Sequence, residues 1–138
     1  MRIVIDNKGF TFDECRFIYD LYYVKGEEYD APTLAGVFKN VLVKWANALQ
    51  NTRDQSDPLY LPFAPDDQWV DCLMATPSGD RLELKAVKVA QSGYSMNFSD
   101  LESFITSPQQ VIESHKTIGE FDKDQFISTL INADVVDE

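Results

Sequence analysis

The sequence predicts an α+β domain in which N-terminal helices pack on an antiparallel β-meander, with a C-terminal helical segment after it. Two patterns carry this prediction. Apolar residues recur every three or four positions over residues 34–49, which is typical of a core helix. Apolar and polar residues alternate over 69–75 and 81–90, on either side of a turn sequence, which is typical of a β-hairpin. With 138 residues, 44% of them hydrophobic, and no repeat or linker, we expect a single domain spanning residues 1–138.

The chain is predicted to open with a short strand and a helix. Residues 2–5, Arg-Ile-Val-Ile, precede a turn sequence and are expected to be extended. Thr11 and Glu14 then match a capping box, in which each side chain satisfies a free backbone N–H at the start of a helix. A helix is therefore expected over residues 12–25.

The helix at 34–49 should lie at the centre of the core. Its apolar positions fall on one face: Leu34, Val37, Phe38, Val41, Leu42, Trp45 and Leu49. Lys39 and Lys44 lie on the opposite face, which we expect to be exposed and mildly basic. Trp45 and the other apolar residues are expected to be buried against the hairpin residues Val70, Cys72, Leu82 and Leu84.

Three prolines separate this helix from the hairpin. Pro58, Pro62 and Pro65 exclude a helix and argue against a central strand. An extended, packed connection is therefore predicted over residues 57–67.

The alternation in the hairpin also predicts its register. If the apolar residues of both strands share one buried face, Asp71 lies directly opposite Lys85. A cross-strand ion pair on the exposed face is then expected, with the turn at residues 76–80.

The C-terminal third is predicted to contain short elements of both kinds. A strand is expected over residues 93–97, and Ser99 with Glu102 repeats the capping-box pattern ahead of a short helix. Ser107-Pro108 is expected to start a further helical turn that reaches residue 112.

A last strand and a last helix complete the prediction. The strand is expected over residues 115–121. Asp122 and Gln125 form a third capping pattern, which predicts a helix immediately afterwards. Residues 134–138 are expected to be a frayed tail.

The chain is strongly acidic, and its acidity lies toward the C-terminal end. Asp and Glu number 23 against 12 Lys and Arg, which gives a net charge of −11. A charge of this sign repels nucleic acids and anionic membranes, so direct binding to either is not expected. From residue 90 onward, nine acidic residues stand against two basic ones, Lys116 and Lys123.

The spacing of potential ligands indicates neither a metal nor a cofactor. Cys15 and Cys72 fall in apolar stretches far apart in the sequence, where reduced, buried thiols are expected. His115 is the single histidine and has no cysteine near it in sequence, so no zinc site is indicated. Asp122-Lys123-Asp124 lacks the glycine and the glutamate that a calcium loop needs further on. No leader or membrane-span pattern is present either, so a cytoplasmic protein is expected.

One pattern is similar to an enzyme motif. Pro65-Asp66, Asp71 and Glu83-Leu84-Lys85 resemble the metal-dependent nuclease signature of Pro-Asp followed by Asp or Glu, any residue, and Lys. Carboxylates on adjacent strands can hold a divalent metal that activates water, while the lysine orients the nucleophile. The resemblance implies a nuclease that uses Asp71, Glu83 and Lys85, with Asp66 as a further carboxylate. The competing interpretation is the exposed ion pair between Asp71 and Lys85.

The other candidate site is a partner-binding surface in the acidic C-terminal half. It would be formed by Tyr94, Asp100, Glu102, Glu120, Asp122 and Asp124. Carboxylates beside an aromatic anchor suit a basic protein surface, such as the substrate groove of an enzyme that cleaves nucleic acids. The same acids would also stabilise helix N-termini or keep the surface solvated.

The chain combines four general features: a short strand at Arg2–Ile5, a strand at Trp69–Met74, an acidic composition and no complete catalytic motif. In this build it resembles bacterial immunity proteins of contact-dependent growth inhibition and related polymorphic toxin systems. The resemblance implies a non-enzymatic cytoplasmic protein that binds a cognate basic toxin, a nuclease, one to one and covers its active-site or substrate-binding surface. Two alternatives stay open: the nuclease described above, and an acidic nucleic-acid mimic that inhibits a host DNA-binding protein.

Overall fold

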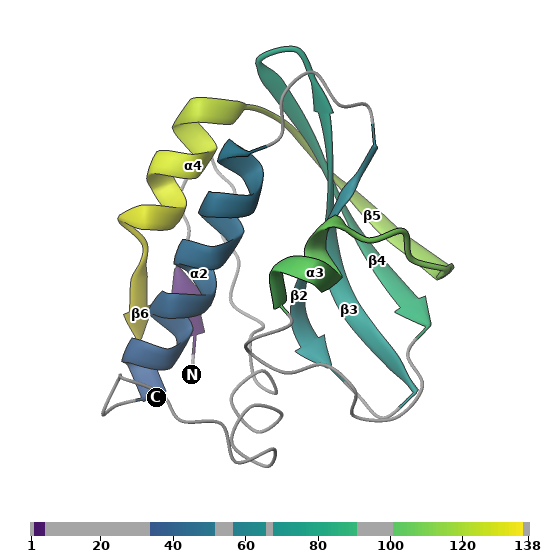
Figure 1. Cartoon of the computed structure of the whole chain (residues 1–138), viewed down its shortest axis with the longest axis horizontal. Coiled ribbons are helices and arrows are strands. Elements are labelled where there is room, and N and C mark those ends of the chain that lie inside the picture. Colours follow the sequence, from purple (N-terminus) through teal and green to yellow (C-terminus); the bar gives the residue numbers. More distant parts are fainter. Residues whose placement is uncertain (1, 5–33, 52–56, 66–67, 91–100, 137–138) are drawn as a thin grey trace.

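The computed structural model of the chain describes residues 2–4, 34–51, 57–65, 68–90 and 101–136. It shows an α+β domain, with helices packed against a four-stranded antiparallel sheet (Figure 1). The helix predicted at 12–25 and the strand predicted at 93–97 lie outside the described residues.

The main sheet is the predicted meander. It consists of β2 (Leu59–Pro65), β3 (Trp69–Ser78), β4 (Arg81–Ala90) and β5 (Val111–Asp122), in the order β2-β3-β4-β5. Each neighbouring pair is antiparallel. The turn between β3 and β4 is shorter than predicted: it contains only Gly79 and Asp80, because Ser78 already pairs with Arg81. Gly79 has φ 61°, in the left-handed region that favours glycine.

Residues 59–65 are extended and are not a central strand, as predicted, but they form a paired strand of the sheet where only a connection was predicted. Two of the three prolines, Pro62 and Pro65, lie within β2 and pair in register with Cys72 and Val70. β2 is at the edge of the described sheet, where a residue without an N–H can direct its nitrogen away from the neighbouring strand. A bulge between Pro62 and Ala64 interrupts the pairing.

The predicted register of the hairpin is also wrong. Asp71 lies opposite Lys88, three residues along from the predicted partner Lys85. An odd shift moves every side chain of one strand to the other face of the sheet.

The register differs because the hairpin buries opposite faces at its two ends. Near the turn, the buried residues are Leu73, Ala75, Leu82 and Leu84, which share one face. At the open end, they are Val70, Cys72, Val87 and Val89, which share the other. The prediction assumed that both strands bury the same face along their whole length. It therefore paired residues that lie on different faces of the sheet.

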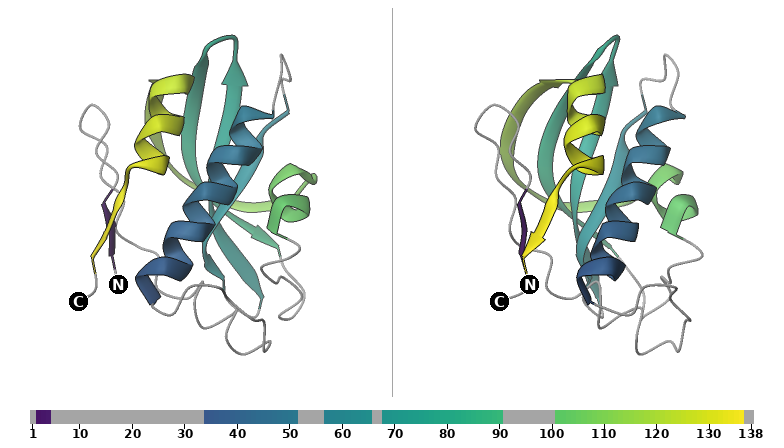
Figure 2. Two further views of the ribbon diagram at one scale, coloured as in Figure 1. Left: turned by 60° about the vertical axis from the view of Figure 1, so that its left-hand side comes forward. Right: turned by 90° about the vertical axis from the view of Figure 1, so that its left-hand side faces the viewer.

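The helices lie to one side of the main sheet (Figures 1 and 2). They are α2 (Leu34–Gln50), α3 (Leu101–Thr106) and α4 (Lys123–Ile131). The start of α4 is as predicted, because the Asp122 carboxylate accepts a hydrogen bond from the Gln125 N–H at 2.8 Å. Phe121, opposite Leu82 on β4, packs on Phe126 of α4 with ring centroids 6.1 Å apart. This contact places α4 over the turn end of the hairpin.

The core centre is as predicted from the periodicity of α2. Trp45 is the largest fully buried side chain, and it lies in one cluster with all four hairpin residues named above as its expected neighbours. Val41, Leu42 and Leu49 are fully buried beside it. The side chains of Leu34 and Phe38 lie outside those described.

Two predictions near the C-terminus are wrong. Residues 111 and 112 begin the strand β5, which extends the predicted strand at 115–121 in both directions, so no helical turn follows Ser107. The predicted tail contains a strand, β6 (Asp134–Val136), which pairs with β1 (Arg2–Val4) as a second, two-stranded antiparallel sheet. Both strands depend on partners distant in sequence, which local patterns do not indicate.

The lysines of α2 connect helices and do not form a free basic face. The Lys39 ammonium donates hydrogen bonds to the carbonyls of Ile131 and Ala133, the second at 3.1 Å. A cation here also interacts favourably with the C-terminal end of the α4 dipole. Lys44 lies 3.9 Å from the Glu102 carboxylate on α3.

Replacing Trp45 by alanine should lower the free energy of unfolding by about 3–5 kcal/mol, because a large, fully buried side chain is removed from the centre of the core. Urea denaturation followed by fluorescence or circular dichroism measures this. Val43→Ala on the same helix, where the side chain is 38% exposed, is the matched control and should change stability little. Near-normal stability of the Trp45 variant would show that α2 is peripheral.

Candidate functional site: an acidic end of the sheet

Carboxylates gather where the β3–β4 turn meets the start of α4. The backbone N–H of Lys123 donates to the Asp80 carbonyl at 2.8 Å, which holds the turn against the first residue of the helix. We call this region the acidic end, and it comprises Asp80, Glu83, Glu120, Asp122 and Asp124. Arg81 and Lys123 are the basic residues among them, so the five carboxylates leave the region with a net charge of −3.

Glu83 and Glu120 lie directly opposite each other on β4 and β5. Both are exposed, with the Glu120 side chain 60% accessible. Like charges at directly opposite positions of an antiparallel pair are destabilising. Arg81 offsets part of this repulsion, because its Nε lies 3.2 Å from Glu120 Oε1. An exposed pair of this kind contributes little stability.

Asp122 and Asp124 both stabilise the start of α4. Asp122 caps α4, and Asp124 lies in its first turn, where a negative charge interacts favourably with the helix dipole. Both acids would be expected in this helix whatever the protein binds. Of the juxtaposed glutamates, Glu120 has the weak, exposed ion pair with Arg81, and the repulsion between the two carboxylates is only partly offset.

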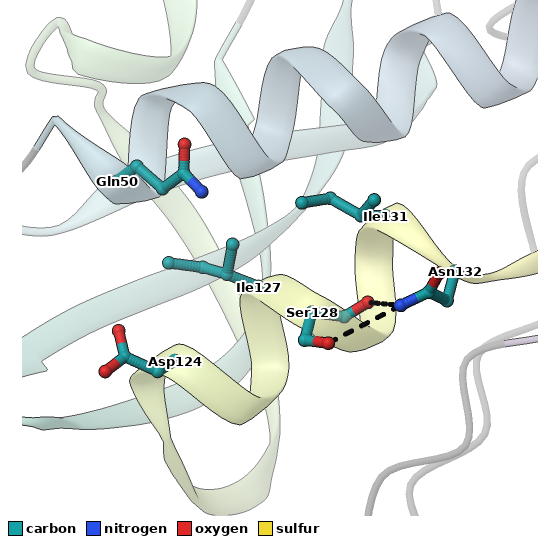
Figure 3. A pocket seen from close by; sticks show the side chains of 6 residues that line it. All are labelled: Gln50, Asp124, Ile127, Ser128, Ile131 and Asn132. Atoms are coloured by element: carbon teal, nitrogen blue, oxygen red, sulfur yellow. Dashed lines mark hydrogen bonds between the residues drawn. The ribbon is translucent and has the colours of Figure 1, made fainter.

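A shallow pocket of about 260 Å³ lies beside the acidic end, between the C-terminal end of α2 and one face of α4 (Figure 3). It is lined by Gln50, Asp124, Ile127, Ser128, Ile131 and Asn132. The Asn132 amide donates to the Ser128 carbonyl at 2.9 Å, so this polar pair is satisfied within α4. The lining carries one carboxylate and no basic group. The described residues contain no group of three metal-ligating side chains, here or elsewhere.

The structure brings together three of the six residues predicted to bind a partner. Glu120, Asp122 and Asp124 meet at the acidic end, and they are joined by Asp80 and Glu83, which were not predicted. Glu102 does not belong with them: it is on α3, which packs against β2, at the opposite edge of the sheet from β5. Tyr94 and Asp100 lie outside the described residues. Glu83 joins the site through the pairing of β4 with β5, which sets it opposite Glu120 and which local sequence patterns do not indicate.

The residues of the nuclease motif do not form a metal site. Asp71 and Glu83 point to opposite faces of the sheet. Asp71 lies opposite Lys88, and Lys88 is five residues from Glu83 along β4. Asp71 and Glu83 are therefore displaced by about 17 Å along the strand direction. Metal–oxygen distances of about 2.0–2.6 Å leave no shared ion across this gap. Asp66 lies outside the described residues.

The predicted ion pair between Asp71 and Lys85 is wrong for the same reason. Lys88 occupies the position opposite Asp71. Its ammonium lies 3.9 Å from Glu113 Oε2 and 4.5 Å from the centre of the Trp69 ring. Lys88 therefore combines an ion pair with a cation–π contact at the open end of the hairpin.

Cys72 is a fully buried thiol in the core. Burial, and secondly the nearby Asp71 carboxylate, raise the pKa of this thiol well above its ordinary value. Burial and Cys72 likewise raise the pKa of the Tyr60 hydroxyl. The Cys72 thiol is accordingly held in its protonated, unreactive form. Cys15 and the His115 side chain lie outside the part of the molecule that is described.

Comparison of the chain with protein-family models, curated proteins and solved structures finds no match. Among the described helices, none is long and apolar enough to cross a membrane.

Neutralising one of the opposed glutamates should stabilise the protein. Glu83→Gln removes a like-charge contact and should raise the free energy of unfolding by about 0.2–1 kcal/mol at low salt, less at high salt. Glu102→Gln is the control of opposite sign, since it removes an attractive contact with Lys44. Chemical denaturation at two salt concentrations measures both, and a destabilised Glu83 variant would contradict the repulsion inferred here.

The buried thiol should make stability fall at alkaline pH. In the unfolded chain the thiol ionises near pH 8.5, whereas the folded protein retains the proton, so alkali favours unfolding. Above that pH, the free energy of unfolding should fall by up to about 1.4 kcal/mol per pH unit because of this thiol. Unfolding measured from pH 7 to 9.5, relative to Cys72→Ala, isolates the effect. A constant difference between the two proteins across this range would contradict it.

Proposed function

We propose that this protein is an immunity protein that binds a basic bacterial toxin of the nuclease class through the acidic end, one to one and without turnover. The observation that carries the proposal is the exposed, directly opposed pair Glu83 and Glu120. Natural sheets disfavour such a pair because it lowers their stability. A partner that brings lysine or arginine side chains to this place would relieve the repulsion and gain from both carboxylates.

The charge distribution supports the same partner chemistry. Nucleases bind phosphates, so their substrate grooves are basic and complementary to a cluster of carboxylates. With a net charge of −11, the whole chain would attract such a groove over distances beyond contact. Attraction of this kind mainly accelerates association, which suits an inhibitor that must act before its target does damage. The protein would do this in the cytoplasm and without a metal or cofactor.

The other two functional hypotheses fit the geometry less well. A metal-dependent nuclease needs Asp71 and Glu83 on one ion, and they are on opposite faces. A nucleic-acid mimic needs carboxylates arranged like the phosphates of a duplex, whereas the acidic end gathers them around a single junction of turn, strand and helix.

The test is the association rate with the protein encoded by the neighbouring gene, purified in an inactive form. In the double variant Glu83→Gln, Glu120→Gln, the on-rate should fall on the order of fivefold at low salt, and its salt dependence should weaken. Stopped-flow fluorescence or surface plasmon resonance measures both. The helix acids stay unchanged, because altering the cap at Asp122 would also affect stability.

The matched control removes the same charge elsewhere. Asp57→Asn with Glu102→Gln leaves an identical net charge, and both residues are exposed and absent from the acidic end. If the two double variants slow association equally, only the total charge matters and the acidic end is not the binding surface. If the wild-type protein does not bind the neighbouring product at all, the proposed function is wrong.

A further inference from the structure

The first residues of β5 are exposed on both sides of the strand. The four consecutive residues 111–114 are all exposed. Because alternate residues of a strand point in opposite directions, both faces of the strand are exposed here. Two of these residues are large and apolar: Val111 and Ile112. At 50%, Ile112 is the most exposed large hydrophobic side chain in the described part of the molecule.

A bulge turns Ile112 outward. Lys88 pairs with Glu113, and Val89 pairs with Val111, so Ile112 is the extra residue that has no partner position on β4. Bulges re-aim side chains and are frequent at functional positions on sheet edges. An isoleucine at this place gives neither ladder pairing nor full core burial, so its presence is not explained by the fold.

The surface next to the bulge is held in place by specific contacts. The Lys88 ammonium lies between the Trp69 ring and the Glu113 carboxylate, at 4.5 Å and 3.9 Å. Trp69 is half-buried. The contacts of Trp69 with Lys88 order this part of the surface before binding, which reduces the entropy lost in a complex.

We infer that Ile112, with Val111 beside it, is the apolar anchor by which this protein holds its basic partner. The inference rests on the proposed function and adds to it a division of labour along β5. The carboxylates at one end of the strand accelerate association, and Ile112 near the other end enters an apolar pocket of the partner and slows dissociation.

Charge decides between a basic partner and a second copy of this chain. Two copies meeting along β5 would bring together surfaces that each carry Glu113 and Glu120, on molecules with a net charge of −11. A partner with basic residues around an apolar pocket meets the opposite condition. Glu120 follows Ile112 by eight positions along β5, a span of about 26 Å, which fits within one interface of standard size.

The experiment compares Ile112→Ala with Val43→Ala in binding to the purified, inactivated product of the neighbouring gene. Val43 is the control, because it is 38% exposed but lies on α2, away from both the acidic end and the first half of β5. Ile112→Ala should increase the dissociation rate at least about tenfold and change the association rate less than about twofold. Val43→Ala should change neither. Thermal unfolding of both variants confirms that they remain folded.

Each result leads to a definite conclusion. If the wild type binds and Ile112→Ala dissociates no faster than Val43→Ala, the anchor is wrong while the proposed function stands. If the wild type self-associates in sedimentation experiments and Ile112→Ala abolishes this, the anchor serves a second copy and the inference is overturned. If the wild type does not bind the neighbouring product, the proposed function and the anchor that rests on it both fail.

Discussion

The arrangement of this protein depends on a two-residue turn. Because Gly79 adopts the left-handed conformation, Ser78 pairs directly with Arg81, and this first pair fixes every later partner of β3 and β4. The pairing places Asp71, a carboxylate of the nuclease-like motif, opposite Lys88. Asp71 therefore points to the other face of the sheet from Glu83. The separate pairing of β4 with β5 sets Glu83 opposite Glu120.

The same turn connects the sheet to the last helix. The Asp80 carbonyl accepts from the Lys123 N–H, so the helix starts where the hairpin reverses. Two of the surrounding acids follow from the needs of that helix, one as its cap and one near its positive end. The opposed glutamates have no such origin. The acidic end therefore combines charges that stabilise the fold with an opposed pair whose repulsion reduces its stability, and it is the second kind on which the proposed partner would act.

Local patterns predicted the elements whose signals are local. The periodicity of α2, the alternation in β3 and β4 and the Asp122–Gln125 cap were sufficient to predict a core helix, two strands and the start of α4. The register was not predictable by the same reasoning, since the hairpin buries one face near its turn and the other at its open end. The start of β5 and the strand β6 depend on distant partners. Three acids of the site were predicted, but Glu83 joins them only through the long-range pairing of β4 with β5.

The pairing of β1 with β6 has a consequence for how the chain completes its fold. Arg2 pairs with Val136, so this small sheet joins the first described strand to the last. During synthesis, β1 leaves the ribosome long before its partner exists, and the two strands can pair only after residues 134–136 have emerged. Closing so large a loop costs chain entropy that only the packed core between the two strands can offset. We therefore expect the two-stranded sheet of β1 and β6 to form last, after the core has already packed.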